Sequence, residues 1–347
     1  MRAQSGHFPV LVLLLLSTVS GGCSASEGKR AAAEGARLYD QGNYDAALPL
    51  LEKAVESVRD DGQLYYQLAY IHELKGDSEK AKALREKAEP LLVRLAASTK
   101  GSLEDSYYLT ALYRSQQRTE EMKQAAEAGL RKFAQRIVLS GEDLFRLGRL
   151  YEFAGNGPLS ATTYRQAVGL MEKEKSPNPI LFALALSSDA DTDLQSRRFE
   201  DAAGKLERAE SLNPKSPPAA FRLALVELAA ARYPQARSRF GQVQDEATIS
   251  EAQYGADVAR HLESCGGRVE KTPEGKLFAE LDKTALEASL ADAARSYREA
   301  KDKEAGGSEK LREAERTFFS LSAEWMLRGN SLRDTSLGGN YADLIRR

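Results

Sequence analysis

The feature that most constrains this chain is an internal repeat with a period of 34 residues. Three pairs of small residues recur at that spacing: Gly42 and Gly76, Ala47 and Ala81, and Ala54 and Ala88. A fixed period of this length is the mark of a repeat array, in which each unit contacts mainly its neighbours. Small residues at fixed positions let two helices approach closely, because larger side chains would overfill their crossing. The period therefore predicts an array of closely packed helix pairs.

The residues around this repeat resemble the tetratricopeptide family. Residues 35–48 have that family's order of a small residue, a turn glycine, an aromatic residue and a second small residue at the helix crossing. Six units begin near residues 28, 62, 103, 141, 183 and 217, at steps of 34, 41, 38, 42 and 34 residues. The resemblance implies an all-α tetratricopeptide-repeat solenoid over residues 28–250, with about six helix-turn-helix units in a right-handed superhelix.

Beyond residue 250 the repeat fades and a second helical pattern begins. One apolar stripe runs from Phe278 to Tyr297, and another runs from Leu311 to Trp325 at steps of 3 and 4 residues. Two glycines at 306–307 separate the stripes and predict the turn of a helical hairpin. We expect residues 251–328 to form a helical cap on the last apolar face of the array, with a coiled-coil arm as the alternative. Residues 329–347 are predicted to form a flexible tail.

The amino end has the pattern of a targeting segment. An uncharged apolar stretch at residues 8–16 follows Arg2 and is far shorter than the roughly 20 residues of a membrane-spanning helix. The stretch leads to Gly21-Gly22-Cys23, which resembles the box of bacterial lipoproteins, where small residues precede a cysteine that is acylated. An ordinary secreted protein with a stray thiol at Cys23 is the alternative.

The lipoprotein resemblance implies a signal peptide over residues 1–22 and a lipid-modified, palmitate-bearing Cys23 as the first mature residue. Residues 23–27 then form a lipidated tether. In that family an Asp directly after the cysteine favours the inner membrane, whereas this chain has Ser24. The resemblance therefore implies a bacterial outer-membrane lipid anchor with the protein facing the periplasm.

Composition and motifs argue against several classes of function. Lys and Arg number 49 against 51 Asp and Glu, so the formal charge of −2 offers no excess positive charge for nucleic acid. Three His and two Cys are too few for a zinc ribbon, a haem motif or a disulfide framework. The chain has no glycine-rich phosphate loop, no G-x-S-x-G and no H-E-x-x-H. We expect no enzyme activity, no cofactor, no metal and no small-molecule substrate.

One acidic run resembles a calcium-binding loop. Asp189, Asp191 and Asp193 alternate, and Glu200 stands at the twelfth position, where a bidentate glutamate belongs. The sixth position, which needs glycine for a sharp turn, is Leu194. The run is therefore interpreted as the solvated acidic end of a helix.

The groove of the repeat array is the predicted functional surface. In the tetratricopeptide family, the fifth and ninth residues of each unit's first helix project into the concave face. The resemblance assigns a peptide-binding role to Tyr66, Tyr70, Tyr107, Phe145, Arg149, Phe221 and Leu225. Four aromatic residues at one structural position would give a peptide a large contact area. Packing of the same rings against neighbouring units is the alternative.

These features together predict a lipid-anchored scaffold that binds protein partners in the cell envelope. Its role would be the assembly or localisation of an envelope complex, such as secretin, pilus, motility or outer-membrane assembly machinery. A regulatory adaptor that recruits a cell-wall hydrolase or synthase is the alternative.

Overall fold

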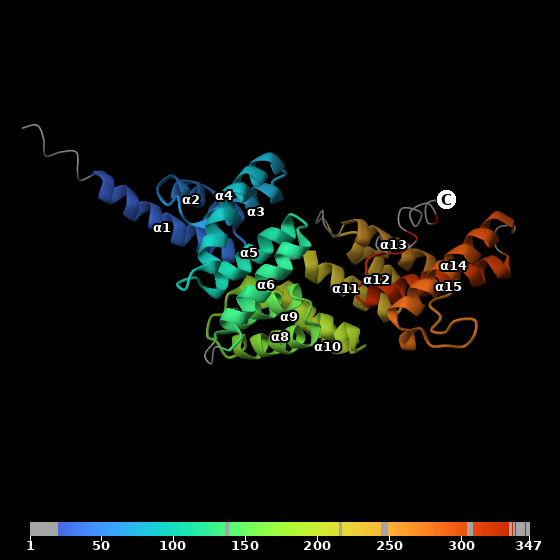
Figure 1. Ribbon diagram of the computed structural model, residues 1–347. Helices are drawn as coiled ribbons and strands as arrows, with labels where there is room; N and C mark the ends of the chain where they lie inside the picture. Colours follow the sequence, from blue (N-terminus) through green and yellow to red (C-terminus); the bar gives the residue numbers. More distant parts are fainter. Residues whose placement is uncertain are drawn as a thin grey trace, which may run out of the picture. The chain divides into compact units, whose positions relative to one another are not determined.

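The computed structural model describes residues 20–135, 139–214, 217–243, 249–303 and 308–332, together with Thr335, Leu337 and Leu344. This part of the chain forms fifteen α-helices and one short 3₁₀ helix, and its β-structure is limited to an isolated bridge between Lys271 and Leu277. Figure 1 shows the helices following one another along the chain. The predicted all-α class is confirmed.

Twelve of the helices form six consecutive pairs. The pairs are α1 (Ser20–Asp40) with α2 (Tyr44–Ser57), α3 (Gly62–Leu74) with α4 (Ser78–Ala97), α5 (Leu103–Ser115) with α6 (Thr119–Phe133), α7 (Gly141–Phe153) with α8 (Gly157–Met171), α9 (Pro179–Gln195) with α10 (Phe199–Leu212), and α11 (Pro217–Ala229) with α12 (Tyr233–Phe240). Three helices follow the pairs: α13 (Ile249–Ser264), α14 (Lys283–Lys303) and α15 (Glu309–Leu327), with the 3₁₀ helix η1 (Phe278–Glu280) between α13 and α14.

The chain divides into two compact bodies. The amino-terminal body contains the described residues up to Leu139 together with Arg146–Ser160. The carboxyl-terminal body contains Ser140–Phe145 and the described residues from Ala161 onward.

Each helix pair is joined by a tight turn that contains one residue with a positive φ. These residues are Gly42, Gly76, Gln117, Gly155, Arg197 and Ala231. They are separated by 34, 41, 38, 42 and 34 residues, the same steps as the unit starts predicted from the sequence. The three residues other than glycine have φ of 58–59°, a conformation that costs a residue with a Cβ about 1–2 kcal/mol. The structure confirms six helix-turn-helix units.

Polar side chains fix the points at which several first helices begin. The Asp61 carboxylate accepts hydrogen bonds from the backbone N–H groups of the first turn of α3, and Asn178 does the same for α9. At α5, the Ser102 hydroxyl accepts from the Asp105 N–H while the Asp105 carboxylate accepts from the Ser102 N–H. Such caps satisfy N–H groups that the helix itself leaves without acceptors.

Alanines fill the closest contacts inside the pairs. The alanines of the 34-residue repeat, at 47, 54, 81 and 88, have no solvent exposure. Ala126, Ala167, Ala202 and Ala236 are equally buried in the second helices of later pairs. The expectation that small residues mark helix crossings is therefore confirmed.

The last three helices share one apolar core with the final repeat pair. That core contains Trp325 and Phe319 of α15, Tyr297 of α14 and Phe240 of α12. The packing is that of a cap on the end of the array, as the sequence predicted, rather than of a free arm. The glycines predicted to form the hairpin turn lie outside the described residues. In the predicted flexible tail, Leu344 is buried in the same core.

A buried carboxylate connects the cap to the fifth repeat pair. Glu324 of α15 is 2% exposed and accepts hydrogen bonds from Arg197, in the turn after α9, at 2.6 Å and from Arg328 at 3.0 Å. Arg328 also donates to the backbone oxygens of Phe278 and Leu281. These bonds satisfy a charge that would otherwise be costly to bury.

The described amino end includes part of the predicted targeting region. Residues 1–19 lie outside the described residues. The helix α1 begins at Ser20 and so includes residues 23–27, which the sequence assigned to a tether; the side chain of Cys23 is not described. Within the described residues, no helix combines the length and apolar character needed to cross a membrane.

Candidate functional site

Six tyrosines from four helices lie together in the amino-terminal body. This tyrosine cluster consists of Tyr39, Tyr44, Tyr66, Tyr70, Tyr107 and Tyr108. The rings of Tyr39, Tyr44 and Tyr70 pack edge to face, with centroids 5.5–5.7 Å apart. The Tyr108 ring lies 5.1 Å from Tyr66 and 5.4 Å from Tyr107. Tilted and edge-to-face contacts of this kind favour a rigid surface.

The structure places three of the predicted groove residues in this cluster. Tyr70 is 37% exposed, Tyr66 and Tyr107 are half-buried, and these three residues come from the first helices of neighbouring pairs. Tyr39, Tyr44 and Tyr108 were not predicted from the sequence, because they occupy other positions of their helices. The tyrosine cluster therefore extends beyond the fifth and ninth helix positions that the resemblance implied.

Burial disfavours ionisation of four hydroxyl groups of the cluster. It raises the pKa of Tyr39, Tyr44, Tyr66 and Tyr108 well above the ordinary value, and the neighbouring tyrosines add to the effect. A protonated phenol both donates and accepts hydrogen bonds. The cluster therefore combines aromatic area with hydroxyl groups that can donate and accept hydrogen bonds.

Arg149 lies over the ring of Phe153, which belongs to the same body but not to the tyrosine cluster. Its guanidinium is 4.6 Å from the centroid of Phe153 and donates to Glu152 at 2.8 Å. A cation over an aromatic face is favourable. The predicted groove residue Arg149 thus has both a ring and a carboxylate as neighbours.

The other three predicted groove residues belong to the carboxyl-terminal body and are packed. Phe145 is 2% exposed, with its ring 5.9 Å from that of Tyr164. Leu225 is 4% exposed, and the half-buried Phe221 contacts the ring of Phe240 at 5.6 Å. At these positions the geometry is that of the packing alternative.

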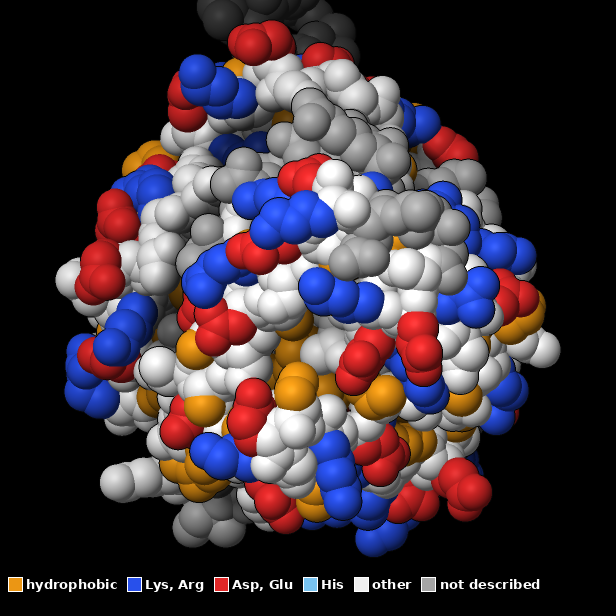
Figure 2. Space-filling view, turned by 90° about the vertical axis from the view of Figure 1, so that its right-hand side faces the viewer, with side chains coloured by type: hydrophobic (Ala, Val, Ile, Leu, Met, Phe, Trp, Pro, Cys, Tyr) orange, Lys and Arg blue, Asp and Glu red, His pale blue; other side chains and the backbone are white. Residues whose placement is uncertain are grey.

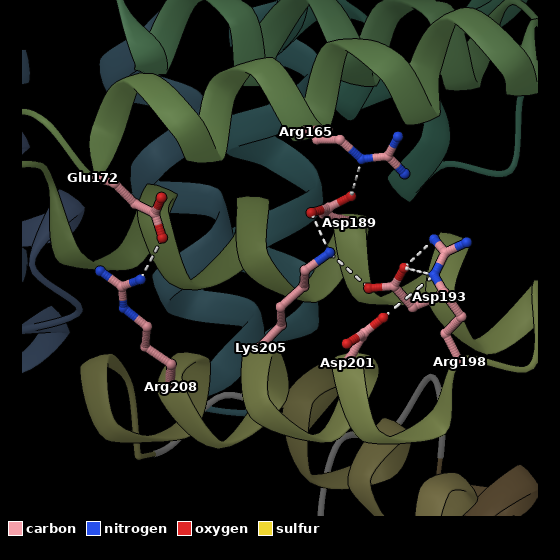
Figure 3. A network of polar contacts seen from close by, with 8 residues as sticks. All are labelled: Arg165, Glu172, Asp189, Asp193, Arg198, Asp201, Lys205 and Arg208. Atoms are coloured by element: carbon pink, nitrogen blue, oxygen red, sulfur yellow. Dashed lines mark hydrogen bonds and ion pairs between the residues drawn. The ribbon is translucent and has the colours of Figure 1, made fainter.

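The acidic run that resembled a calcium loop lies inside α9 (Figure 3). The side chains of Asp189 and Asp193 are one helical turn apart and only 2% exposed. The expectation that this run is solvated was therefore wrong for these two residues, because basic side chains from neighbouring helices neutralise them. Asp191 lies apart from them and pairs with Arg222 of α11.

Lys205 of α10 binds both buried carboxylates. Its Nζ lies 2.5 Å from Oδ2 of Asp189 and 2.6 Å from Oδ2 of Asp193. Arg165 and Arg198 approach the same carboxylates from the sides, as Figure 3 shows. Burial raises the pKa of the Asp193 carboxyl, but hydrogen bonds from Lys205 and Arg198 outweigh it and hold that pKa below its ordinary value. This network joins α8, α9 and α10, and the protein's own cations pair with both carboxylates.

On the face seen in Figure 2, charged side chains of one sign do not gather into a single patch. Lysine and arginine side chains there lie beside aspartate and glutamate side chains, with hydrophobic side chains scattered between them. Within the described residues, no group of three or more His, Cys, Asp and Glu side chains is arranged to hold a metal ion. The tyrosine cluster is the candidate binding surface that the geometry supports best.

Comparison with known families agrees with this architecture. The model of the tetratricopeptide repeat matches residues 38–97, in the first two helix pairs, and again residues 189–247, in the last two. The fold is thus an all-α repeat array that presents a cluster of aromatic side chains. Both matched segments of the chain contain tetratricopeptide repeats.

Solved structures of other helical-repeat proteins resemble this chain at low sequence identity. A chain of the APC/C hetero-tetramer Cut9-Hcn1 aligns with 70% of this chain at 12% identity and a TM-score of 0.46, over 46% of its own length. TTC0263 of Thermus thermophilus aligns with 58% of this chain and 99% of its own length, at 22% identity and a TM-score of 0.39. The structure of pilF of Pseudomonas aeruginosa aligns with 67% of this chain and 99% of its own length, at 14% identity and a TM-score of 0.37. No curated protein matches the chain in sequence.

Proposed function

We propose that this protein is a lipid-anchored scaffold of the bacterial cell envelope, which binds a segment of a partner protein on its tyrosine cluster. The observation that supports the binding role is the cluster itself: six tyrosines held by four helices, with Tyr70 reaching solvent. Tyrosines supply large contact area at low entropic cost and add hydrogen bonds at their rims. The protein would act by contact and not by catalysis.

The rigid frame behind the cluster suits a binding surface. Its tyrosines project from paired helices whose crossings are filled by buried alanines, so little order has to be gained when a partner binds. Neighbouring helix pairs bring the rings side by side, which is a property of the array rather than of any single unit. A bound segment would assemble or localise the partner complex at the membrane.

The proposal of an envelope location rests on the amino-terminal sequence. The apolar stretch and the Gly21-Gly22-Cys23 triplet support an acylated Cys23, and Ser24 supports the outer membrane. Several acyl chains on one cysteine can hold a folded body at a bilayer, because each buried CH₂ contributes about 0.8 kcal/mol. No spanning helix is needed for such an anchor.

Truncation of the exposed part of the cluster tests the binding role. The variant with Tyr70→Ala and Tyr107→Ala should capture less partner protein from detergent-solubilised envelopes, because the ring surface in contact with the partner is lost. Mass spectrometry of the captured proteins measures this loss. The variant Leu159→Ala, which removes an apolar side chain that is 46% exposed on α8, is the control and should capture as much as the wild type. Equal capture by all three proteins would contradict the proposal.

Replacing the acylated residue tests the anchor separately. Cys23→Ala should leave the fold intact and release the protein into the soluble periplasmic fraction, because the helix pairs carry their own core while the acyl chains supply membrane affinity. Fractionation of washed membranes, with circular dichroism of the released protein, measures both properties. Retention of the folded variant in the membrane would show that something other than the lipid holds it there.

A further inference from the structure

His72 of α3 is buried between two carboxylates of the amino-terminal body. Its side chain is 7% exposed. The Nε2 atom lies 3.7 Å from Oε1 of Glu52 in α2, and the Nδ1 atom lies 3.5 Å from Oδ2 of Asp77, the residue that caps α4. Both distances are longer than the roughly 2.7–2.9 Å of a hydrogen bond between charged groups. Among the described residues, the buried Nε2 atom has no hydrogen-bond partner.

One of these two carboxylates has no cation of its own. Lys80 of α4 lies 3.0 Å from Glu52, at the same oxygen that faces His72. The Asp77 carboxylate accepts a hydrogen bond from the backbone N–H of Lys80 at 3.3 Å. Within the described part of the chain, no lysine or arginine side chain lies within 4.0 Å of the Asp77 carboxylate. Two carboxylates and one ammonium group therefore surround a ring that can supply the second cation.

The next charged side chains along the chain from His72 are already paired. Lys75, in the turn after α3, lies 2.6 Å from Asp45 of α2. Glu73, at the end of α3, pairs with Arg85 of α4. Each of these two pairs is neutral, so neither supplies a charge to balance the Asp77 carboxylate.

The protonation state of the His72 ring decides how the ring meets the two carboxylates. A neutral imidazole has one N–H group and one lone pair, so one of its nitrogens must turn a lone pair toward a carboxylate oxygen. A protonated imidazole has two N–H groups, one for Glu52 and one for Asp77. Histidine side chains change their charge between about pH 5 and pH 8. Mild acid therefore favours the form in which both ring nitrogens are paired.

His72 shares its helices with the tyrosine cluster. Tyr70 lies two residues before His72 in α3, and α2, which contains Glu52, begins with Tyr44. The rings of Tyr44 and Tyr70 lie 5.6 Å apart. A hydrogen bond from His72 to Glu52 would thus join the two helices that carry these rings. A partner would then have less order to impose on the rings when it binds.

We propose that protonation of His72 strengthens the binding of a partner segment to the tyrosine cluster. The inference rests on the proposed binding function and adds its regulation by pH. The protonated ring would tie α2 and the first turn of α4 to α3, and this order favours the bound state. Because the two hydrogen bonds exist together only in the protonated form, the partner binds the two forms with different affinity.

The affinity of a selected peptide at two pH values tests this inference. Dodecapeptides are selected from a phage-displayed random library on the wild-type protein in mild acid. Sequences without Asp, Glu, His and Cys are then synthesised with blocked termini, so that the peptide itself does not titrate. In isothermal titration calorimetry, the wild type should bind these peptides about fivefold or more tightly at about pH 5.5 than at about pH 7.5. His72→Gln, whose side chain does not titrate, should bind them with equal affinity at both pH values.

Two further variants control for packing around the buried ring. Asp77→Asn removes one carboxylate charge but keeps a side chain that caps helices equally well, so the pH effect should shrink while the fold is unchanged. His261→Gln changes the other described histidine, which lies in α13 of the carboxyl-terminal body, and should keep the full pH effect of the wild type. Circular dichroism at both pH values verifies the fold of each variant.

The outcomes separate this inference from the proposed function. Equal affinity of the wild type at both pH values would overturn the role of His72 while binding by the cluster stands. A full pH effect in His72→Gln or in Asp77→Asn would overturn it as well, because another group would then be the one that titrates. If the peptides bind equally to the variant with Tyr70→Ala and Tyr107→Ala in mild acid, the cluster is not the binding surface and the proposed function fails.

Discussion

Replacing Lys205 by Met is expected to reduce the free energy of unfolding by about 3–5 kcal/mol. The substitution removes the ammonium group that lies within 2.6 Å of both buried carboxylates, Asp189 and Asp193. Two negative charges would then face each other one helical turn apart, with only Arg165 and Arg198 left to offset them. Chemical denaturation followed by circular dichroism measures the change.

The control for Lys205→Met is a cation of the same helix on the surface. Arg208 of α10 pairs with Glu172 at 2.5 Å, and both side chains are nearly half exposed. The Arg208 guanidinium also lies 4.8 Å from the centroid of the Phe182 ring. An exposed ion pair and an exposed cation–π contact each contribute up to about 1 kcal/mol, so Arg208→Met should cost at most about 2 kcal/mol, less than Lys205→Met. If both variants lost the same small amount, the buried network of Figure 3 would not be a stabilising feature.

Phe145→Ala should destabilise the protein by about 3–5 kcal/mol, although the family resemblance placed Phe145 in a binding groove. The ring is 2% exposed and packs on Tyr164, so truncation leaves a cavity in the core of the carboxyl-terminal body. Thermal and chemical unfolding of the purified variant measure the loss. This result would decide between groove and packing at that position.

Tyr70→Ala is the comparison for Phe145→Ala, because both residues came from the same sequence argument. Tyr70 is 37% exposed and its truncation removes edge contacts with Tyr39 and Tyr44, so about 1–2 kcal/mol is expected. A stable Phe145→Ala variant, or an unfolded Tyr70→Ala variant, would reverse the assignment of the two positions.

The arrangement of helix pairs could be predicted from the sequence because equivalent residues recur at regular spacing. Small residues such as Ala47 and Ala81 recur where helices cross, and this spacing predicted the steps between the six turns. The turns themselves were less visible, since Gln117, Arg197 and Ala231 take a conformation for which glycine is the usual signal. Periodicity of the whole unit compensated for these missing glycines.

The candidate site was only partly predictable because it is assembled across helix pairs. A rule based on fixed positions in each first helix found Tyr66 and Tyr107 but could not find Tyr108, whose ring lies near both from the next position of α5. The same rule included Phe145, because sequence position does not report how deeply a ring is buried. Packing between neighbouring helices decides that, and it has no signature at a single position.

The acidic run shows which signal could have corrected an expectation. Asp189 and Asp193 are four residues apart and therefore lie on one face of a helix, with Lys205 twelve residues after Asp193 in the following helix. Carboxylates spaced in this way, followed by a lysine in the next helix, are consistent with a buried interhelical ion pair as well as with a solvated face. The depth of burial, which sequence spacing does not report, distinguishes the buried ion pair from the solvated face.

The bond between Arg197 and Glu324 constrains the order in which the chain can fold. The two residues are 127 positions apart in sequence, whereas partners within a repeat pair are close neighbours along the chain. Local pairs close short loops and can form while the chain is still emerging from the ribosome, but this contact has to wait for α15. A nascent chain that stops before α15 would therefore leave Arg197 of the fifth turn without Glu324 and the last pair with an uncovered apolar face. The carboxyl-terminal helices act as the closing step of folding, after which the array no longer offers an open end to other chains.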